Sequence, residues 1–346
     1  MNPVFIRVPF VVSSEVRWAD NLSGMLTEAI RYFRVRDGRC YGVDVNRELK
    51  IDEHEGKVMK KLFRIHQSSG MHWVGNGFPV RSVFDYNGLG RELSPFLLLD
   101  YAAPYEFTPG KEKRGVGAHP HKGFETVTVA YQGELAHRDS SGGGGTIGPG
   151  DVQWMTAGNG IVHEEFHSQE FTRKGGPLQM VQLWVNLRAK DKTAKPRYQT
   201  LLKAQIPTVE LPDDAGSVRV IAGDCGGHRG AAKTFSPINL WDVNLRAGKS
   251  AELPLPDGHT TTFLVLSGEV TVNSERDARE GDLVIFARDG DGITVKAKAD
   301  AKLLVMDGEP IAEPIVGHGP FVMNSRAEIQ QAFEDYQLGR MGEILA

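Results

Sequence analysis

The chain has 346 residues, of which 40% are hydrophobic and 24% are charged, and its formal net charge is −4. This length is comfortable for two domains, and the composition is that of an ordinary soluble globular protein. The small negative charge gives no reason to expect binding to nucleic acid or to a membrane surface, and no apolar run approaches the ~18 residues of a membrane span.

Glycine, proline and cysteine usage narrow the class further. The 40 glycines and 18 prolines favour many turns between short strands over long helices. Cys40 and Cys225 are the only cysteines and lie far apart, which suits a reducing compartment. Residues 1–12 are apolar but lack the basic start and the cleavage site of a signal peptide. We therefore expect a cytoplasmic protein.

Residues 1–58 differ in pattern from the rest of the chain and carry no chemical motif. Residues 23–33 could form a short helix. We interpret residues 1–58 as an N-terminal extension of unknown role. It could be a small regulatory segment, but the pattern favours a poorly ordered tail or sequence upstream of the true start, because Met59 would make a natural beginning for the first β domain.

Strand-like apolar runs alternate with turn signals from residue 61 to residue 107. Gly75-Asn76-Gly77 separates two such runs and predicts a hairpin. The continuous apolar run at residues 96–101 is short enough for a buried strand. This region therefore predicts β structure.

Two pairs of metal-capable residues come next. His119 and His121 run into the β-branched stretch 126–131, so we expect residues 119–131 to form one strand and its entry. His163 and Glu165 form the second pair. Side chains at i and i+2 of a strand point to the same face, so three imidazoles and a carboxylate converge if the two segments lie side by side. Such a set can ligate a divalent metal such as iron.

A run of four glycines, residues 142–145, lies between the two pairs. It lacks the Lys-Ser/Thr ending and the following helix of a phosphate-binding loop. We therefore expect a hairpin tip there.

The second half of the chain repeats the first in outline. Gly133-Glu134 is followed by the turn Gly150-Asp151, and Gly268-Glu269 is followed by Gly281-Asp282, each time with a new strand after the turn. Two copies of one all-β unit explain this pattern, with residues 59–190 in the first and 191–346 in the second. The second copy lacks the ligand pairs, because only His259, followed by three threonines, stands at the first of them.

The C-terminus departs from the β pattern. Ser325 and Glu328 form a capping box, and Gly339 supplies a stop. Apolar residues recur between them at helical spacing: Ile329, Ala332, Phe333 and Tyr336. We expect a helix that packs on the β domains, with partner binding as the alternative.

Residues 60–340 resemble the pirin family of the cupin superfamily. The resemblance rests on linked segments spread through both halves. They are residues 93–100, His119-Pro120-His121-Lys122-Gly123-Phe124-Glu125, residues 150–158, Ile161-Val162-His163-Glu164-Glu165, residues 183–187 and 319–324. The resemblance implies two tandem cupin barrels of the jelly-roll (double-stranded β-helix) type with a C-terminal helix. It further implies one Fe(2+) in the N-terminal barrel and a C-terminal barrel without metal.

The resemblance also implies the ligand set. The family's metal ligands fall on His119, His121, His163 and Glu165 of this sequence. A broader cupin pattern would instead take the acidic ligand from Glu125, which shares strand parity with both N-terminal histidines. We favour the pirin pattern and keep Glu125 as the alternative. Gln153 and Glu125 could orient imidazoles or contact substrate.

The resemblance implies two functions. The first is a quercetin 2,3-dioxygenase, in which Glu165, or alternatively Glu125, accepts the flavonol hydroxyl proton and ring opening with O2 releases carbon monoxide and a depside. The second is a non-enzymatic, metal-dependent regulator that binds a transcription factor or a metabolic enzyme. Other divalent metals compete with iron for such a site.

Overall fold

The computed structural model describes residues 58–68 and 70–344, together with the backbone of four short strands nearer the N-terminus. These strands pair antiparallel as β1 (Phe10–Val12) with β2 (Glu15–Arg17) and β3 (Phe33–Arg36) with β4 (Arg39–Gly42). Residues 1–56 and 57–346 form two separate compact units. The helix expected over residues 23–33 lies outside the described residues, except for Phe33, which begins β3.

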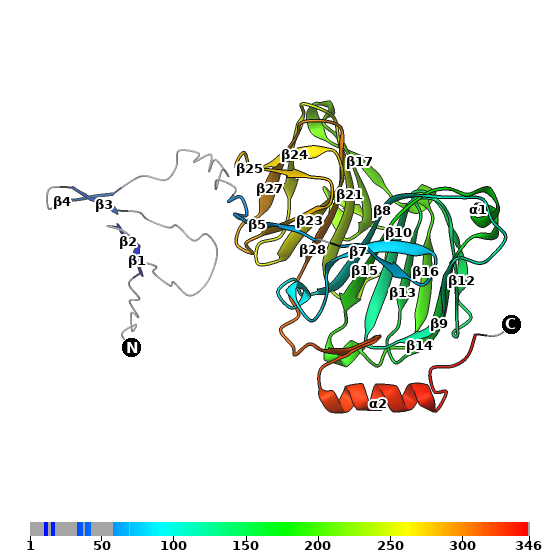
Figure 1. Ribbon diagram of the computed structural model, residues 1–346. Coiled ribbons are helices and arrows are strands. Elements are labelled where there is room, and N and C mark those ends of the chain that lie inside the picture. The colour runs from blue at the N-terminus through cyan, green and yellow to red at the C-terminus, as the bar shows by residue number, and fades with distance from the viewer. Residues whose placement is uncertain are drawn as a thin grey trace, which may run out of the picture. The chain divides into compact units, whose positions relative to one another are not determined.

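The first barrel consists of a seven-stranded sheet and a four-stranded sheet (Figure 1). The order of the larger sheet is β16 (Arg197–Leu201), β13 (Val152–Thr156), β10 (Phe124–Gln132), β15 (Gly176–Asn186), β8 (Phe96–Phe107), β7 (Phe78–Phe84) and β6 (His72–Val74). The order of the smaller sheet is β12 (Gly144–Ile147), β11 (Leu135–Asp139), β14 (Ile161–His167) and β9 (Gly115–His121).

The second barrel repeats this arrangement, again with one seven-stranded and one four-stranded sheet. The larger sheet runs β17 (Thr208–Glu210), β18 (Gly216–Ala222), β21 (Ile238–Leu245), β28 (Ala301–Gly308), β23 (Thr260–Ser267), β26 (Asp282–Phe286) and β5 (Leu62–Gln67). The smaller one runs β22 (Ser250–Pro254), β27 (Gly292–Ala297), β24 (Glu269–Val272) and β25 (Arg276–Arg279). The predicted all-β fold of two tandem cupin barrels is confirmed.

The two barrels exchange edge strands. β5 lies near the start of the described chain yet pairs with β26 of the second barrel, and β16 comes after residue 191 yet pairs with β13 of the first. The expected boundary between the two domains lies between residues 190 and 191. β5 precedes it but completes a sheet of the second barrel, and β16 follows it but completes a sheet of the first.

A shared apolar layer joins the barrels. One cluster of buried side chains contains Val127 and Trp154 from the first large sheet together with Leu240 and Leu304 from the second. A separate cluster fills the interior of the second barrel and another the interior of the first. Because β strands alternate their side chains, one face of each large sheet packs against the other barrel and the opposite face lines its own barrel.

The remaining elements are short. The two-stranded ribbons are β19 (Asp224–Cys225) with β20 (His228–Arg229) and β29 (Val316–His318) with β30 (Phe321–Met323). The helix α1 (Gln169–Lys174) precedes β15, and single 3₁₀ turns are η1 (Leu89–Arg91), η2 (Ala189–Asp191), η3 (Lys203–Gln205) and η4 (Pro212–Asp214). Among the described residues, no helix is long and apolar enough to cross a membrane.

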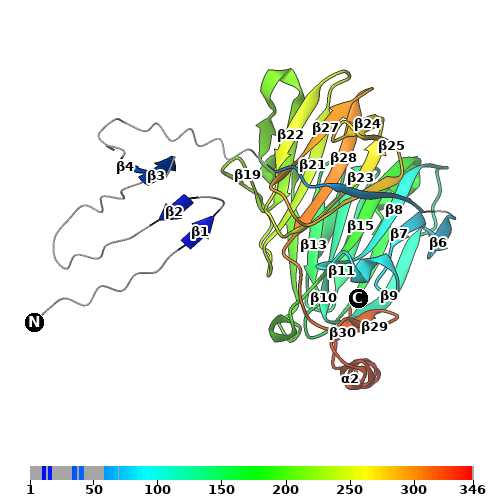
Figure 2. The ribbon, with the colours of Figure 1, turned by 90° about the vertical axis from the view of Figure 1, so that its left-hand side faces the viewer.

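The predicted C-terminal helix forms as α2 (Arg326–Gln337). The Ser325 hydroxyl accepts a hydrogen bond from the Glu328 backbone N–H, so the predicted cap is confirmed. Ile329 and Ala332 are buried against the β30 residue Phe321, while Tyr336 stays exposed. In Figures 1 and 2 the helix lies across one end of the first barrel, which confirms the predicted packing.

The expected single strand over residues 119–131 is wrong. β9 ends at His121 and β10 begins at Phe124, and the two strands belong to different sheets. Gly123 sits between them with a φ of +91°, a conformation that glycine adopts without steric cost. The hairpin predicted at residues 75–77 is confirmed, because β6 pairs with β7 across this turn.

Candidate metal centre

The register of β9 against β14 assembles the histidines. His119 is the direct partner of His163, and His121 is the partner of Ile161. Between the pair at His163 and the next one at Glu165 the register shifts, so that Glu165 faces Val116 and β9 carries an extra residue there. The predicted adjacency of the two segments is therefore present in the structure.

Three histidines converge at this point. Nitrogen atoms of His119, His121 and His163 all lie within 4.8 Å of one another, a spacing that suits ligands of one metal ion. Their ring centroids are 4.3 to 4.9 Å apart. His121 and His163 are buried, whereas His119 is partly exposed, so the cluster meets solvent on the His119 side.

Hydrogen bonds leave the Nε2 atoms free for ligation. Nδ1 of His119 donates to the Gly117 carbonyl at 2.8 Å, and Nδ1 of His121 donates to the Pro320 carbonyl at 3.3 Å. A carbonyl oxygen only accepts, so both rings carry their proton on Nδ1 when neutral. Nε2 of His163 is buried and has no hydrogen-bond partner among the described residues. An orphaned nitrogen beside two others fits a metal ligand.

The electrostatics of the cluster agree with this fit. Burial, reinforced by the neighbouring imidazoles, holds the pKa of His121 and of His163 well below the usual range. Both rings are therefore neutral near pH 7, which is the form that binds metals.

Among the described residues, Glu165 shares this close spacing with His163 and His137 and not with His119 and His121. Its Oε1 accepts a hydrogen bond from Nε2 of Gln153 at 2.5 Å, and its Oε2 accepts one from Nε2 of Gln182 at 2.9 Å. The Thr128 hydroxyl approaches Oε1 at 3.4 Å. The predicted orienting role of Gln153 thus falls on the carboxylate of Glu165 and not on an imidazole.

A fourth histidine, His137, was missed by the sequence reasoning. It lies on β11 opposite Glu165 and forms a second potential ligand group with His163 and Glu165. Its Nδ1 is 3.3 Å from Nδ1 of His163, and its ring stacks on Tyr198 at 4.6 Å between centroids. The pair His137 and Asp139 repeats the i, i+2 spacing of the two predicted pairs, so the signal was present in the sequence.

The glycine-rich turn positions Asp139. Oδ1 of Asp139 accepts hydrogen bonds from the Ser141 N–H, the Ser141 hydroxyl and the Gly143 N–H, and Oδ2 accepts one from Nε2 of His137 at 3.0 Å. Burial raises the pKa of Asp139, but these hydrogen bonds outweigh it and the net effect lowers the pKa. The predicted hairpin tip is confirmed, because β11 pairs with β12 across this turn, and the turn holds the buried carboxylate of Asp139 beside His137.

Glu125 lies on the face of β10 that is turned toward the other barrel. It points to the same face of β10 as Val127 and Val129, which belong to the apolar layer between the barrels, while Thr128 points inward toward Glu165. Its Oε1 accepts a hydrogen bond from the Thr156 hydroxyl at 2.6 Å, and burial raises its pKa to about 7. Because the chain changes sheets at Gly123, the strand parity that Glu125 shares with His119 and His121 in the sequence does not bring it beside them.

The interior beyond Glu165 is closed by an aromatic cluster. His167 is buried there between Phe78, Phe107 and Phe171. Its Nε2 donates to the Gly77 carbonyl at 2.8 Å. This end of the barrel is therefore sealed by packing.

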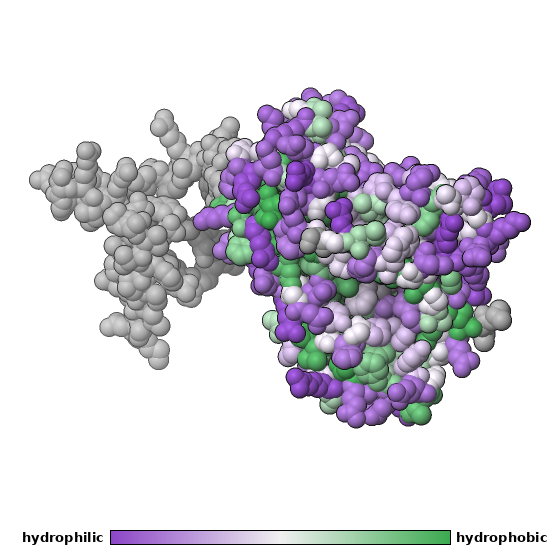
Figure 3. All heavy atoms as spheres, viewed as in Figure 1, coloured by the Kyte–Doolittle hydropathy of each residue, from purple (hydrophilic) through white to green (hydrophobic). Residues whose placement is uncertain are grey.

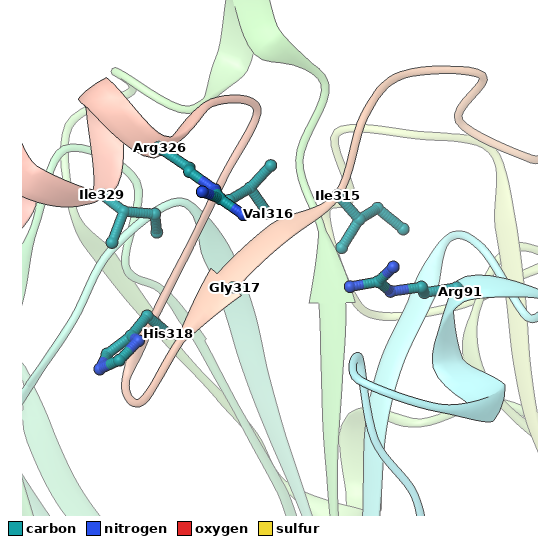
Figure 4. A pocket seen from close by; sticks show the side chains of 7 residues that line it. All are labelled: Arg91, Ile315, Val316, Gly317, His318, Arg326 and Ile329. Atoms are coloured by element: carbon teal, nitrogen blue, oxygen red, sulfur yellow. The ribbon is translucent and has the colours of Figure 1, made fainter.

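A separate pocket of about 490 Å³ lies beside α2. Arg91, His318 and Arg326 line it together with apolar side chains (Figure 4). None of the predicted metal ligands is among the lining residues. The molecular face in Figure 3 is a mosaic of hydrophilic residues and small hydrophobic patches.

Comparisons with known proteins place these features in a family. A family model described as Pirin matches residues 77–185, and one described as Pirin C-terminal cupin domain matches residues 240–342. A Pseudomonas aeruginosa protein named "Putative quercetin 2,3-dioxygenase" is 58% identical over 282 residues, which are 82% of this chain and 98% of the relative. Human Pirin is 37% identical over 258 residues, covering 73% of this chain and 84% of the relative.

A solved structure shows the same arrangement. The crystal structure of quercetin 2,3-dioxygenase from Acinetobacter baumannii superimposes with a TM-score of 0.81 at 52% sequence identity. The match covers 83% of this chain and all of that chain.

Proposed function

Because this chain belongs to the pirin family, we propose that it is a metal-dependent dioxygenase that opens the ring of a flavonol such as quercetin with O2. The observation that carries the proposal is the convergence of His119, His121 and His163, in which Nε2 of His163 has no partner among the described residues, together with the nearby Glu165 carboxylate held by two amide donors. The names of the Pseudomonas and Acinetobacter relatives support the choice of substrate class.

The three histidines and Glu165 are the residues that would hold the metal. Iron in its Fe(2+) state is our first choice, because a set of imidazoles with one carboxylate suits it, although manganese, nickel and copper accept similar ligands. When bound, such an ion supplies a Lewis-acid site at which flavonol oxygens and O2 can be brought together. We place the activity in the cytoplasm, in line with the cysteine usage.

Glu165 is the proposed base. A flavonol becomes electron-rich enough to react with O2 when its ring hydroxyl loses its proton, and a carboxylate within hydrogen-bond reach can accept that proton. Gln182 occupies one lone pair of Oε2, and the other can serve either the metal or the flavonol proton, so Glu165 would act as the base when it is not a ligand. Gln153 and Gln182 keep the carboxylate plane fixed while this happens. Glu125 takes no part in this proposal because it faces the apolar layer between the barrels.

The barrel supplies the surroundings for the reaction. His121 contacts Phe124 and Trp184, with ring centroids 5.2 and 5.1 Å away, so one side of the cluster is apolar. The sealed aromatic end beyond His167 keeps solvent from entering behind Glu165. Substrate and O2 are therefore expected to approach from the His119 side. Ring opening inserts both atoms of O2 into the flavonol and releases carbon monoxide, leaving a depside.

A single set of assays tests the proposal. The full-length protein is loaded with Fe(II) without oxygen, and then loss of quercetin absorbance, O2 uptake and carbon monoxide release are measured together. We expect equal stoichiometry of the three and near-complete loss of turnover in His119→Ala and Glu165→Gln. The control is Asp307→Asn, which alters a buried carboxylate of the second barrel. Turnover that is unchanged in both site variants, or absent in a fully loaded wild type, would reject the proposed reaction.

A further inference from the structure

A line of three side chains runs from the turn at residues 140–143 to the histidine cluster. Asp139 contacts His137, and His137 contacts His163, whose Nε2 is the buried nitrogen without a partner among the described residues. All three face the barrel interior, because Asp139 is the β-ladder partner of His163 and His137 is the partner of Glu165. Neither His137 nor Asp139 is among the predicted ligands.

The carboxylate of Asp139 determines which ring nitrogen carries the proton in His137 and in His163. Asp139 already accepts three hydrogen bonds at Oδ1 from the turn, so its carboxylate acts as an acceptor throughout. Nε2 of His137 must then be the donor to Oδ2, which leaves Nδ1 of a neutral His137 as an acceptor. Within the described part of the chain, the donor that faces it is Nδ1 of His163, at 3.3 Å. The proton of His163 therefore sits on Nδ1, and its Nε2 carries a free lone pair.

This outcome matches the other two histidines. Backbone carbonyl groups hold the Nδ1 protons of His119 and His121 directly. At His163 the side chain of His137 stands in the place of such a carbonyl. An imidazole nitrogen can either donate or accept a hydrogen bond. The contact between His137 and His163 therefore sets the tautomer of His163 only if the tautomer of His137 is itself set by another group. The carboxylate of Asp139 does so.

We propose that Asp139, acting through His137, sets the tautomer of His163 so that its Nε2 can bind a metal. Asp139 and His137 are thus positioning residues for the proposed metal centre, and the inference rests on that centre for its purpose. An Asp139→Asn substitution should exchange donor and acceptor in both hydrogen bonds, from residue 139 to His137 and from His137 to His163. The amide oxygen of Asn keeps the three contacts from the turn, its NH2 group donates to His137, and His137 then donates to Nδ1 of His163. The proton of His163 moves to Nε2, where it blocks ligation.

The first test observes the tautomer directly in metal-free, full-length protein. Long-range ¹H–¹⁵N spectra distinguish Nδ1–H from Nε2–H histidines, and loss of the signals in His163→Gln assigns them. We expect His163 to be the Nδ1–H form in wild type and the Nε2–H form in Asp139→Asn. An Nε2–H form in wild type overturns the proposal without the need for any variant. An unchanged tautomer in a folded Asp139→Asn protein, with folding checked by circular dichroism, also overturns it.

The second test measures metal affinity, with Co(II) as the probe and visible absorption as the signal. Second-layer partners of metal ligands are typically worth about 10- to 100-fold in affinity, so Asp139→Asn should raise the Kd by about that factor. The matched control is Asp307→Asn, since Asp307 pairs with His259 at 2.9 Å in the second barrel. Its Kd for Co(II) should equal that of wild type.

The outcomes separate this inference from the proposed function. Unchanged Co(II) affinity in Asp139→Asn, or an equal loss in Asp307→Asn, overturns the positioning role even if the enzyme is active. Failure of wild type to bind Co(II) overturns the metal centre itself, and the tautomer measurement then stands on its own as the test of the line of hydrogen bonds.

Discussion

His119 lies directly across from His163 on the ladder between β9 and β14, and their ring centroids are 4.3 Å apart. The distance between these two rings is set by paired backbone and not by loop conformation. Sites built on paired strands hold their geometry more tightly than sites on loops. We therefore expect the cluster to be preformed before a metal binds.

Replacing His163 should abolish metal binding. In His163→Gln the buried Nε2 is lost, and an amide is a poor ligand for a divalent transition metal beside imidazoles. Elemental analysis of purified protein should find about one metal per chain in wild type and almost none in the variant. His259→Gln, in the second barrel, is the control and should keep the wild-type content. A wild-type content near two would instead assign a site to the second barrel.

Removing the amide of Gln153 should slow turnover without unfolding the protein. Gln153→Met keeps the volume of the side chain but takes away the donor that holds Oε1 of Glu165. We expect kcat/KM for quercetin to fall by about tenfold, equivalent to about 1.4 kcal/mol. Gln179→Met is the matched control, because Gln179 is also buried but donates to Tyr101. Equal losses in both variants would contradict a specific role.

Glu125 should make stability depend on pH. Burial raises its pKa to about 7 in the folded protein, from 4.5 in the unfolded chain. The folded state therefore binds more protons between these values, and the stability contributed by this group is lost as pH rises through 7. Glu125→Gln mimics the protonated form. Relative to wild type it should gain about 1–3 kcal/mol of unfolding free energy between pH 5 and pH 8.

Denaturant titrations of both proteins at the two pH values measure this difference. A difference that stays constant with pH would mean that Glu125 ionises normally inside the fold. We expect no change in dioxygenase activity in Glu125→Gln, because the carboxylate of Glu125 faces the layer between the barrels and not the interior of the first barrel.

A side chain at Gly143 should disturb the support of the cluster. A Cβ atom there would lie 2.5 Å from Oδ2 of Asp139 and 2.7 Å from Cβ of Tyr198. We expect Gly143→Ala to cost about 1–3 kcal/mol of stability, as overpacking does, and to weaken Co(II) binding. Gly148→Ala is the control, since its Cβ would meet nothing closer than 3.8 Å. Thermal unfolding and metal titration of both variants test the prediction, and equal behaviour of the two would contradict it.

Periodicity within strands predicted which side chains share a face. The i, i+2 pairs His119/His121 and His163/Glu165 lie where that rule puts them, because each pair falls inside one unbroken strand. Glu125 shows the limit of the rule. The count from His121 to Glu125 is even, but β9 ends at His121 and the chain turns at Gly123 into another sheet, so strand parity does not extend to Glu125.

Pairing between distant strands could not be predicted from local pattern. The i, i+2 spacing of His137 and Asp139 puts both on one face of a strand. They join the cluster only because β11 pairs with β14, and the residues near position 137 do not specify that partner. The exchange of β5 and β16 between barrels was missed for the same reason. The internal repeat predicted two β units correctly, but it does not indicate that each barrel takes one edge strand from the part of the chain that forms the other.

The placement of β5 has a consequence for how the protein is made. This strand leaves the ribosome before either barrel, but its partner β26 lies far later in the chain, at Asp282–Phe286. During synthesis, β5 therefore has to wait unpaired while the first barrel is completed, and an unpaired strand edge is a common route to aggregation. We expect folding to finish only after the last barrel has emerged, so nascent chains stalled before residue 282 should depend on chaperones far more than the released protein does.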